Sequence, residues 1–366
     1  MSKEINPWGS DDVTDYEKTA KAFGISPFSG VLKKLKNPHL LMRRCVVFGH
    51  RDFDKVLASK DYAMMTGLMP SGKFHLGHKI LADQIIYHQK ELGAKIFLCV
   101  ADVEAYNMRL ADMKKLRETA IEEYLLNYIA LGLEPKNCDF YFQSDRSKER
   151  ASPYYRLASM AAKKVTMNEL AAIYGDLSPG KIMSVMLQVS DILHPQLKEF
   201  GGNKNVVVPV GIDQDPHIRL SRDIAARFQK ELGFALPGAT YHRFIKGLKG
   251  GKMSSSDPYS YIALTDDPKE AKKKINKYAF SGGRETIEEH RKHGGNPDID
   301  VSFQYLFTQF EPDDRKIEKL RDDYKSGALL TGELKQILIE KLTAFLEDHQ
   351  KKREIARKKV DRFLAE

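Results

Sequence analysis

From Tyr62 onward, short apolar runs alternate with longer segments of helical periodicity, and this alternation constrains the fold more than any other feature of the sequence. Four apolar runs bounded by glycine, proline or aspartate have the pattern of buried strands, at 62–67, 95–102, 139–143 and 205–210. Helical patterns lie between or after them, at 76–92, 113–131, 154–164, 182–193 and 216–232. The alternation predicts an α/β, Rossmann-like domain with a doubly wound parallel sheet.

The segments on either side of this region have a different pattern. Residues 1–60 carry one amphipathic helix around 16–23 and an apolar, arginine-bearing stretch around 40–48, which predicts a short N-terminal extension. After about Asp267 the strand patterns stop, and helices rich in lysine, arginine and glutamate follow. We therefore predict an extension at 1–60, an α/β domain with inserted helices at 61–266 and an α-helical C-terminal domain at 267–366.

Composition narrows the class of protein. The chain has 59 lysines and arginines against 50 aspartates and glutamates, a net charge of +9, which favours a polyanionic partner over charge that serves solubility alone. No apolar run approaches the roughly 20 residues of a membrane helix, and the polar start lacks a secretory signal. Cys45, Cys99 and Cys138 are too far apart in sequence for a zinc pair. We expect a cytoplasmic protein with reduced thiols, no membrane and no resident metal.

The first chemical motif follows the first predicted strand. The segment Thr66–His78 leads from that strand into a helix whose free N–H groups favour phosphate. Gly72 and Gly77 allow close approach of a ligand. His75 and His78 are three residues apart and can donate to one ligand as charge builds. A metal half-site or two surface histidines are the alternatives.

A second basic motif occurs far along the chain, at Gly250-Gly251-Lys252-Met253-Ser254-Ser255-Ser256. Two glycines before a lysine and several hydroxyl side chains are typical of a mobile loop that closes over a triphosphate. In such a loop Lys252 would stabilise the leaving pyrophosphate. A serine-rich surface turn is the alternative. A third segment, Gly211-Ile212-Asp213-Gln214, follows the strand at 205–210 and either contacts a ligand or only caps the next helix.

The apolar helix at 182–193 carries a polar stripe. Ser184, Gln188 and Asp191 lie at i, i+4 and i+7, on one helix face. Such a stripe either faces solvent or lines a pocket, and the hydrophobic surroundings favour the pocket.

Together the first two motifs resemble the paired signatures of class I aminoacyl-tRNA synthetases, HIGH at His75–His78 and KMSKS at Lys252–Ser256. One departure is that Ser255 stands where the family has its second lysine. The resemblance implies ATP as substrate and His75, His78, Lys252 and Ser254 as catalytic residues. The ATP contacts that it implies are Met69, Pro70, Ser71, Gly72, Gly77, Gly211, Ile212, Asp213, Met253, Ser255 and Ser256.

Further segments resemble the archaeal and eukaryotic tryptophanyl-tRNA synthetase family. They are 276–291, 294–296, 300–303 and 326–333, together with Asn6-Pro7-Trp8, Asp15-Tyr16, Arg43-Arg44 and His50-Arg51-Asp52. The resemblance covers nearly the whole chain. It implies L-tryptophan and tRNA(Trp) as substrates, Mg²⁺ assistance, a homodimer, anticodon contact by the C-terminal helices and acceptor-end contact by residues 1–60.

For the tryptophan pocket, the resemblance implies contacts from Met65, Glu104, Ser184, Gln188, Asp191 and Gln214. An indole N–H only donates, so a buried acceptor such as Asp191 suits it. Tyrosyl enzymes also place an aspartate there, so Asp191 does not decide between the two amino acids. The chain departs from the archaeal and eukaryotic pattern at Met65, where that family has tyrosine, and at Cys99, where it has glutamine. Met65, Met183 and Met186 either line an indole slot or pack in the core.

Two alternatives to a tryptophanyl enzyme remain at this stage. A tyrosyl enzyme of the same fold would share both nucleotide motifs. A paralogue that holds RNA without activating an amino acid would not need His75, His78 and Lys252 intact. A small-molecule adenylyltransferase would have no use for the basic helical end.

Overall fold

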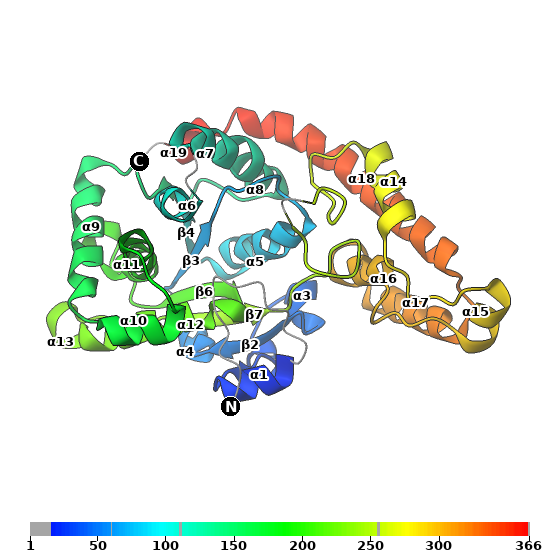
Figure 1. Ribbon diagram of the computed structural model, residues 1–366, viewed down its shortest axis with the longest axis horizontal. Helices are drawn as coiled ribbons and strands as arrows, with labels where there is room; N and C mark the ends of the chain where they lie inside the picture. Colours follow the sequence, from blue (N-terminus) through cyan, green and yellow to red (C-terminus); the bar gives the residue numbers. More distant parts are fainter. Residues whose placement is uncertain (1–15, 60, 110–111, 255–256, 365–366) are drawn as a thin grey trace.

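A seven-stranded sheet forms the centre of the protein in the computed structural model, which describes residues 16–59, 61–109, 112–254 and 257–364 (Figure 1). Its strand order is β1-β2-β7-β6-β3-β4-β5. The strands are β1 (Ser26–Pro27), β2 (Val47–Arg51), β3 (Ala63–Leu68), β4 (Lys95–Val100), β5 (Cys138–Phe142), β6 (Val206–Gly211) and β7 (Gly238–His242). The α/β, doubly wound fold predicted from the alternating pattern is confirmed.

The order of the strands creates one topological switch point. The chain forms β3, β4 and β5 in succession, then returns to the other side of β3 to form β6 and β7. These five strands are parallel to one another, with β3 paired to both β4 and β6. The connections from β3 and β6 leave the sheet in opposite directions, so a crevice opens between their carboxyl ends.

Alternating side chains of the central strands enter two separate cores, as the period of two requires. Met64 and Ile96 pack into the core that contains α5 (Leu76–Leu92) and much of the C-terminal part. Met65 and Phe97 face the other core, which contains α9 (Lys148–Ala162), α11 (Pro179–Leu193) and α12 (Asp215–Arg227). The helices thus cover both faces of the sheet, because every central strand is buried on both sides.

The four strands predicted from the sequence are β3, β4, β5 and β6, and each is confirmed to within two residues. The predicted helix at 76–92 coincides with α5. The pattern at 113–131 forms α7 (Met113–Thr119), a π-helical turn at Ala120–Leu125 and α8 (Leu126–Leu131). The remaining described helices of this region are α6 (Asp102–Arg109), α10 (Met167–Tyr174) and α13 (Gln229–Leu232).

The N-terminal segment is joined to the sheet rather than separate from it. After α1 (Tyr16–Ala22), α2 (Ser29–Leu32) and α3 (Leu40–Arg43), β2 pairs with β7 in antiparallel register, and α4 (Phe53–Ala58) leads to β3. Strands β1 and β2 thereby add an antiparallel edge to the predicted parallel sheet. Arg51 reinforces the junction through a 2.8 Å ion pair with the buried Asp215 at the start of α12.

The C-terminal part forms no strand within its described length after β7, apart from an isolated bridge at Ala263, and from residue 268 onward it consists of helices joined by turns and loops. Its helices are α14 (Pro268–Tyr278), α15 (Ile287–His293), α16 (Val301–Tyr305), α17 (Asp314–Ser326), α18 (Thr331–Arg357) and α19 (Asp361–Leu364). The long α18 runs back across the molecule, and α15 lies at the far tip (Figure 1). Within the described ranges, no helix has both the length and the apolar character needed to cross a membrane.

The glycine-rich segment around 282–295, part of the tryptophanyl-like signature, has a structural basis. Asp300 is fully buried and accepts from Gly282 N at 2.9 Å and from the Tyr324 hydroxyl at 2.8 Å. A Cβ on Gly283 would lie 2.2 Å from Thr331 Oγ1, and one on Gly294 would lie 1.7 Å from a backbone oxygen. The signature therefore builds a tight corner against α17 and α18, away from the crevice.

Candidate active site

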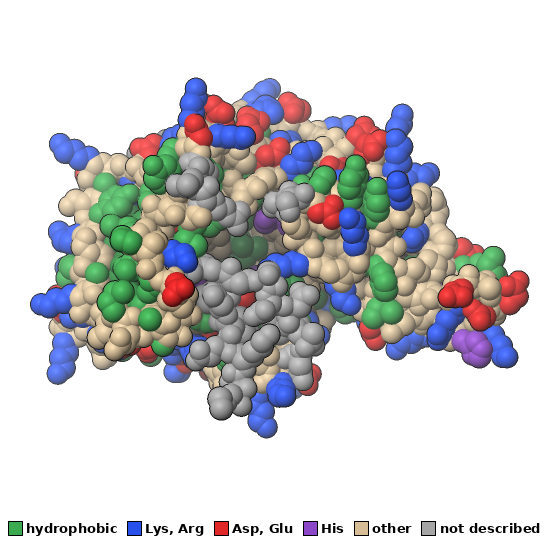
Figure 2. Space-filling view, viewed as in Figure 1, with side chains coloured by type: hydrophobic (Ala, Val, Ile, Leu, Met, Phe, Trp, Pro, Cys, Tyr) green, Lys and Arg blue, Asp and Glu red, His purple; other side chains and the backbone are tan. Residues whose placement is uncertain are grey.

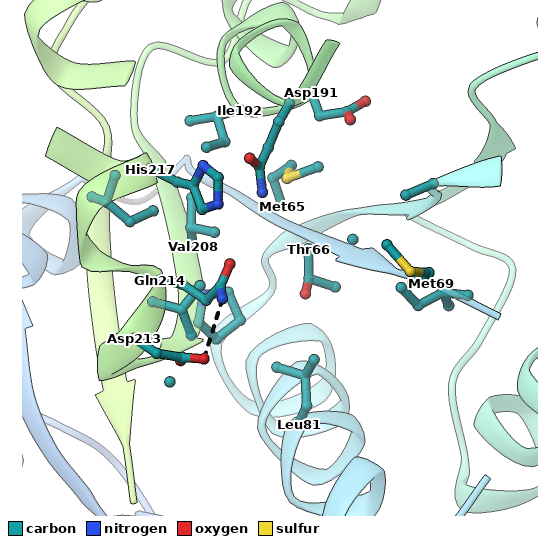
Figure 3. Close-up of a pocket in the computed structure, with 18 of the residues that line it drawn as sticks. Met65, Thr66, Met69, Leu81, Asp191, Ile192, Val208, Asp213, Gln214 and His217 are labelled. Atoms are coloured by element: carbon teal, nitrogen blue, oxygen red, sulfur yellow. Dashed lines mark hydrogen bonds between the residues drawn. The ribbon is translucent and has the colours of Figure 1, made fainter. Parts of the chain in front are cut away.

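A cavity of about 600 Å³ lies at the switch point between β3 and β6. Its walls come from the carboxyl ends of these two strands, from one face of α11, from the start of α12 and from the segment after β7 (Figure 3). The residues predicted from the sequence that line it are Met65, Met69, Glu104, Gln188, Asp191, Gly211, Asp213, Gln214 and Lys252. Residues far apart in the sequence thus meet at the position that the parallel topology favours for a ligand.

Backbone hydrogen bonds join the two nucleotide motifs. Leu76 N donates to Ile262 O at 3.1 Å, and Leu264 N donates to Phe74 O at 2.9 Å. The segment that follows the Lys252 loop therefore pairs with the segment that enters α5. Gly77 fits beneath the loop, because a Cβ there would lie 2.9 Å from the His75 ring and 3.1 Å from Met253 Sδ.

His75 and His78 form a stacked pair at the start of α5, with ring centroids 3.8 Å apart. Gly77 N donates to His75 Nδ1 at 3.1 Å, and His75 N donates to His78 Nδ1 at 3.2 Å. A backbone N–H only donates, so each Nδ1 is an acceptor and each neutral ring carries its proton on Nε2.

Burial determines the charge of this pair. It lowers the pKa of His75 to about 4 and holds that of His78 well below its ordinary value, with the neighbouring His75 adding to the second effect. Both rings are therefore neutral near pH 7, and each offers an Nε2–H donor without the cost of a buried charge. They suit hydrogen bonds to phosphate oxygens rather than full ion pairs.

Lys252 supplies the positive charge of the cavity. Its ammonium group lies 5.5 Å from the centre of the Phe244 ring, and both residues line the cavity. No ion pair within the described residues engages this ammonium group, so it is available to a phosphate. The charge of Lys252 also acts on Asp213, whose pKa it lowers against the larger opposing effect of burial.

Asp213 presents an unsatisfied acceptor at the end of β6. Gln214 Nε2 donates to its Oδ2 at 3.3 Å (Figure 3), whereas its Oδ1 is buried and has no hydrogen-bond partner within the described residues. Burying a carboxylate oxygen without a hydrogen-bond donor lowers the stability of the fold, and a ligand that donates to this oxygen would remove that cost. Gly211 makes room for this arrangement, because a Cβ there would lie 2.7 Å from Asp213 Oδ1 and 2.8 Å from the Phe244 ring.

Asp191 has more partners in the structure than the sequence suggested. Its Oδ1 accepts from the hydroxyls of Tyr141 and Tyr154, each at 2.7 Å, and from Cys99 Sγ at 3.4 Å. Its Oδ2 accepts from Gln143 Nε2 at 2.8 Å. Burial raises the pKa of Asp191, and the four donors oppose that rise. Since a carboxylate oxygen has about two acceptor sites, only Oδ2 retains one for a ligand.

Other predicted residues lie outside this cavity. Ser184 is fully buried, and its hydroxyl donates to Gly180 O at 3.0 Å and accepts from Asn107 Nδ2 at 3.3 Å. The structure therefore does not bring Ser184 to the cavity wall, because it bonds within its own helix and to α6. Pro70, Ser71 and Gly72 line a neighbouring cavity of about 600 Å³, and Met69 lines both cavities.

The rest of the nucleotide motifs is placed as follows. Ile212 is fully buried in the hydrophobic core and does not line the cavity. Ser254 N donates to Ser260 Oγ at 3.0 Å, which holds the loop next to the bridge with α5. Ser255 and Ser256 fall outside the described residues, as do Asn6-Pro7-Trp8 and Asp15.

Sequence reasoning missed His217 and Phe244 in the cavity wall and Tyr141 and Tyr154 behind Asp191. His217 points toward the cavity (Figure 3), and its Nδ1 lies 2.7 Å from the Tyr174 hydroxyl. Burial lowers the pKa of His217 to about 3, so the ring is neutral. His217 stands three residues after Gln214, so a helical count from the Gly211 motif could have located it.

A Rossmann-like sheet with the HIGH-like and KMSKS-like segments joined at its switch point defines a class I aminoacyl-tRNA synthetase. The family described as tRNA synthetases class I (W and Y) matches residues 58–347. The tryptophan–tRNA ligase of Hyperthermus butylicus is 49% identical over 97% of this chain and 96% of its own, and that of Aeropyrum pernix is 46% identical over the same shares.

Solved structures agree with the sequence comparison. The crystal structure of the tryptophanyl-tRNA synthetase of Aeropyrum pernix K1 superposes with a TM-score of 0.91 at 45% identity and covers 98% of both chains. That of the Plasmodium falciparum enzyme has a TM-score of 0.84 at 33% identity, over 95% of this chain and 94% of its own. The chain belongs to the class I tRNA synthetases of the W and Y family and, within it, to the tryptophan–tRNA ligases.

Proposed function

We propose that this protein activates L-tryptophan with ATP and transfers the tryptophanyl group to tRNA(Trp). The observation that carries the proposal is the cavity in which Lys252 and the Gly211 loop meet the polar face of α11, with the His75 motif joined by backbone hydrogen bonds to the segment that follows the Lys252 loop. In the first step the tryptophan carboxylate attacks the α-phosphorus of ATP and releases pyrophosphate. In the second step a terminal ribose hydroxyl of the tRNA takes the tryptophanyl group and releases AMP.

The chemistry needs no protein nucleophile in this proposal, because the substrate carboxylate is one. The chain contributes position and charge stabilisation. The Nε2–H groups of His75 and His78 donate to phosphate oxygens, Lys252 balances the charge of the leaving pyrophosphate, and Ser254 assists through its hydroxyl. Asp213 Oδ1 accepts from a ribose hydroxyl, which would satisfy the partnerless oxygen seen in the structure.

The amino-acid end of the cavity suits a flat apolar ring with one donor. Met65 lies on the wall next to Gln188 and Asp191, and thioether sulfur packs well against aromatic rings. We assign the indole N–H to the remaining acceptor site of Asp191 Oδ2. Tyr141, Tyr154 and Gln143 then hold the carboxylate in place for this bond. Glu104, Gln188 and Gln214 complete the contacts with the polar end of the substrate.

ATP enters as its Mg²⁺ complex in this proposal, because Mg²⁺ is characteristically held by substrate phosphates and water. Within the described residues, no group of three or more histidine, cysteine or acidic side chains is arranged to hold a metal. We therefore assign no side chain as a Mg²⁺ ligand.

The larger partners follow from the same proposal. The basic helices after Asp267 contact the anticodon, residues 1–60 contact the acceptor end, and the protein acts in the cytoplasm, where its tRNA is charged. A homodimer would cover the exposed apolar side chains of Tyr106, Met167 and Met183, on α6, α10 and α11.

Pyrophosphate exchange into ATP tests the proposal. Wild-type protein is expected to show exchange with tryptophan and at least 1000-fold less with tyrosine, because a site built around a buried hydrogen bond rejects a misfitting donor strongly. Asp191→Ala is expected to lower kcat/KM for tryptophan by about 100-fold or more. Exchange stimulated by tyrosine, or by neither amino acid, would move the assignment to a tyrosyl enzyme or to an inactive RNA-holding paralogue.

A further inference from the structure

The helical segment 113–131, which forms α7 and α8, contains a π-helical turn at Ala120–Leu125. Leu126 N donates to Ile121 O, five residues back, instead of to Glu122 O as in an α-helix. The carbonyl of Glu122 thereby loses its helical donor. A backbone carbonyl that has lost its helical donor needs another hydrogen-bond partner, and that partner helps to determine whether the turn is stable.

That partner comes from α18, more than 200 residues later in the sequence. Arg353 Nη2 donates to Glu122 O at 3.0 Å. One turn along the same helix, His349 Nε2 lies 2.7 Å from Asn127 Oδ1, while Asn127 Nδ2 donates to Glu123 O at 2.5 Å. His349 and Asn127 are fully buried, so water does not replace the hydrogen bond between them. Two side chains of α18 thus support the π-helical turn.

The turn places Tyr124 against the catalytic histidines. The Tyr124 ring meets the His78 ring edge to face at 5.3 Å, and it meets the Phe74 ring in the same way at 5.6 Å. Tyr124 is almost completely buried. The π-helical turn changes the direction in which side chains leave the helix. In an α-helix each residue is rotated by about 100° about the axis relative to the one before it, so an α-helical path through this segment would turn the Tyr124 ring away from His78.

We infer that Tyr124 is a positioning residue for His78 and that Arg353 and His349 of α18 hold Tyr124 in place through the π-helical turn. The inference rests on the proposed function only in so far as His78 acts in amino-acid activation. It gives the helical C-terminal part a role in the first step of the reaction, before a tRNA is bound. The coupling runs through direct contacts. Helix α18 bonds a backbone carbonyl of the π-helical turn, the turn carries the Tyr124 ring, and that ring contacts His78.

Two arginines of α18 offer a matched pair for the test. Arg353 bonds the backbone carbonyl of Glu122, whereas Arg357 bonds the carboxylate of the same residue at 2.8 Å on the surface. Arg353→Met is expected to lower kcat for tryptophan-dependent exchange about 10-fold, with KM for tryptophan and ATP changed less than twofold, because a misplaced catalytic group costs rate more than binding. Arg357→Met is expected to leave kcat unchanged.

A second pair tests the ring contact itself. Tyr124→Leu is expected to lower kcat about 10-fold, whereas Tyr124→Phe, which keeps the ring, retains most of it. Tyr128→Leu is the control, because Tyr128 is equally buried and packs on Phe74 at 5.4 Å on the same helix. Thermal unfolding of all five variants identifies any that fail to fold.

The NMR chemical shift of the His78 ring provides a readout that does not depend on activity. It is expected to move in Arg353→Met and Tyr124→Leu and to stay in Arg357→Met and Tyr128→Leu, because an edge-to-face ring shifts its neighbour. Equal kcat values for the two arginine variants, or an unmoved His78 resonance in Tyr124→Leu, would overturn the inference. A wild-type protein without tryptophan-dependent exchange, but with these resonance shifts, would overturn the proposed function alone.

Discussion

Lys252→Ala is expected to lower kcat for tryptophan-dependent pyrophosphate exchange by about 100- to 1000-fold, the usual loss when one group that stabilises transition-state charge is removed. Ser255 stands where related loops carry a second lysine, so Lys252 has no second lysine of the motif to share its task. Its ammonium group lines the cavity beside Phe244, and Lys252 is not among the residues assigned to the amino acid. KM for tryptophan should therefore change little.

Lys249→Ala is the matched control for this loss. Lys249 stands in the same loop, is exposed, and pairs with Asp257 at 2.7 Å rather than lining the cavity. Steady-state exchange kinetics on the two variants should show the large loss in Lys252→Ala alone. Similar losses in both, or a loss confined to KM for ATP, would mean that Lys252 contributes general loop structure or ground-state binding instead of charge stabilisation.

The second large effect concerns stability. Arg51→Leu is expected to lower the free energy of unfolding by about 3 kcal/mol, because it leaves the carboxylate of Asp215 buried without its main partner. Arg51 donates to both carboxylate oxygens, at 2.8 and 2.9 Å, and Asp215 has no exposed surface. The same ion pair attaches the edge strand β2 to the start of α12 and so holds the Gly211 loop in place. Urea denaturation measures the loss.

Arg219→Leu provides the comparison, since Arg219 also reaches Asp215, at 3.3 Å, but from a side chain that is half exposed. An exposed pair contributes about 0–1 kcal/mol, so this variant should unfold close to the wild type. The double variant Arg51→Leu with Asp215→Asn should recover part of the loss, because it removes the unpaired charge. An Arg51→Leu protein as stable as Arg219→Leu would contradict this view of the ion pair.

The parallel core of the fold could be predicted because its strands are buried on both faces. Val206–Gly211 and residues 96–100 are continuous apolar runs, and their carboxyl ends carry the glycines and polar residues of the site. The antiparallel edge could not be predicted in the same way. Strands β2 and β7 are short and contain glycine and histidine, and their pairing depends on a contact between residues nearly 200 positions apart.

In the candidate site, too, the features that depend on neighbouring residues could be predicted, and those that depend on contacts between distant segments could not. The spacing of residues within short motifs was enough to propose His75, His78 and Lys252, because the conformation of a loop and of the start of a helix depends mainly on residues close by in the sequence. The environment of Asp191 was not accessible in this way. Its donors Cys99, Tyr141 and Tyr154 come from β4, β5 and α9, so only the folded chain shows that a single acceptor site remains.

The π-helical turn is a further feature that sequence periodicity could not reveal. The pattern at 113–131 predicts one helix, and one helix forms, but the extra residue that it accommodates depends on Arg353 from the other end of the chain. The backbone geometry of this turn therefore depends on a tertiary contact and not on the local sequence alone.

Aminoacylation of a tRNA(Trp) transcript, with tryptophan and tyrosine in equal amounts and ATP present, tests the central claim most directly. The product is identified by mass spectrometry of the esterified terminal adenosine. We expect tryptophanyl-adenosine as the dominant product, and its loss when Lys252→Ala replaces the wild type. Tyrosyl-adenosine, or no esterified product from folded wild-type protein, would contradict the assignment of this chain as a tryptophan-activating ligase.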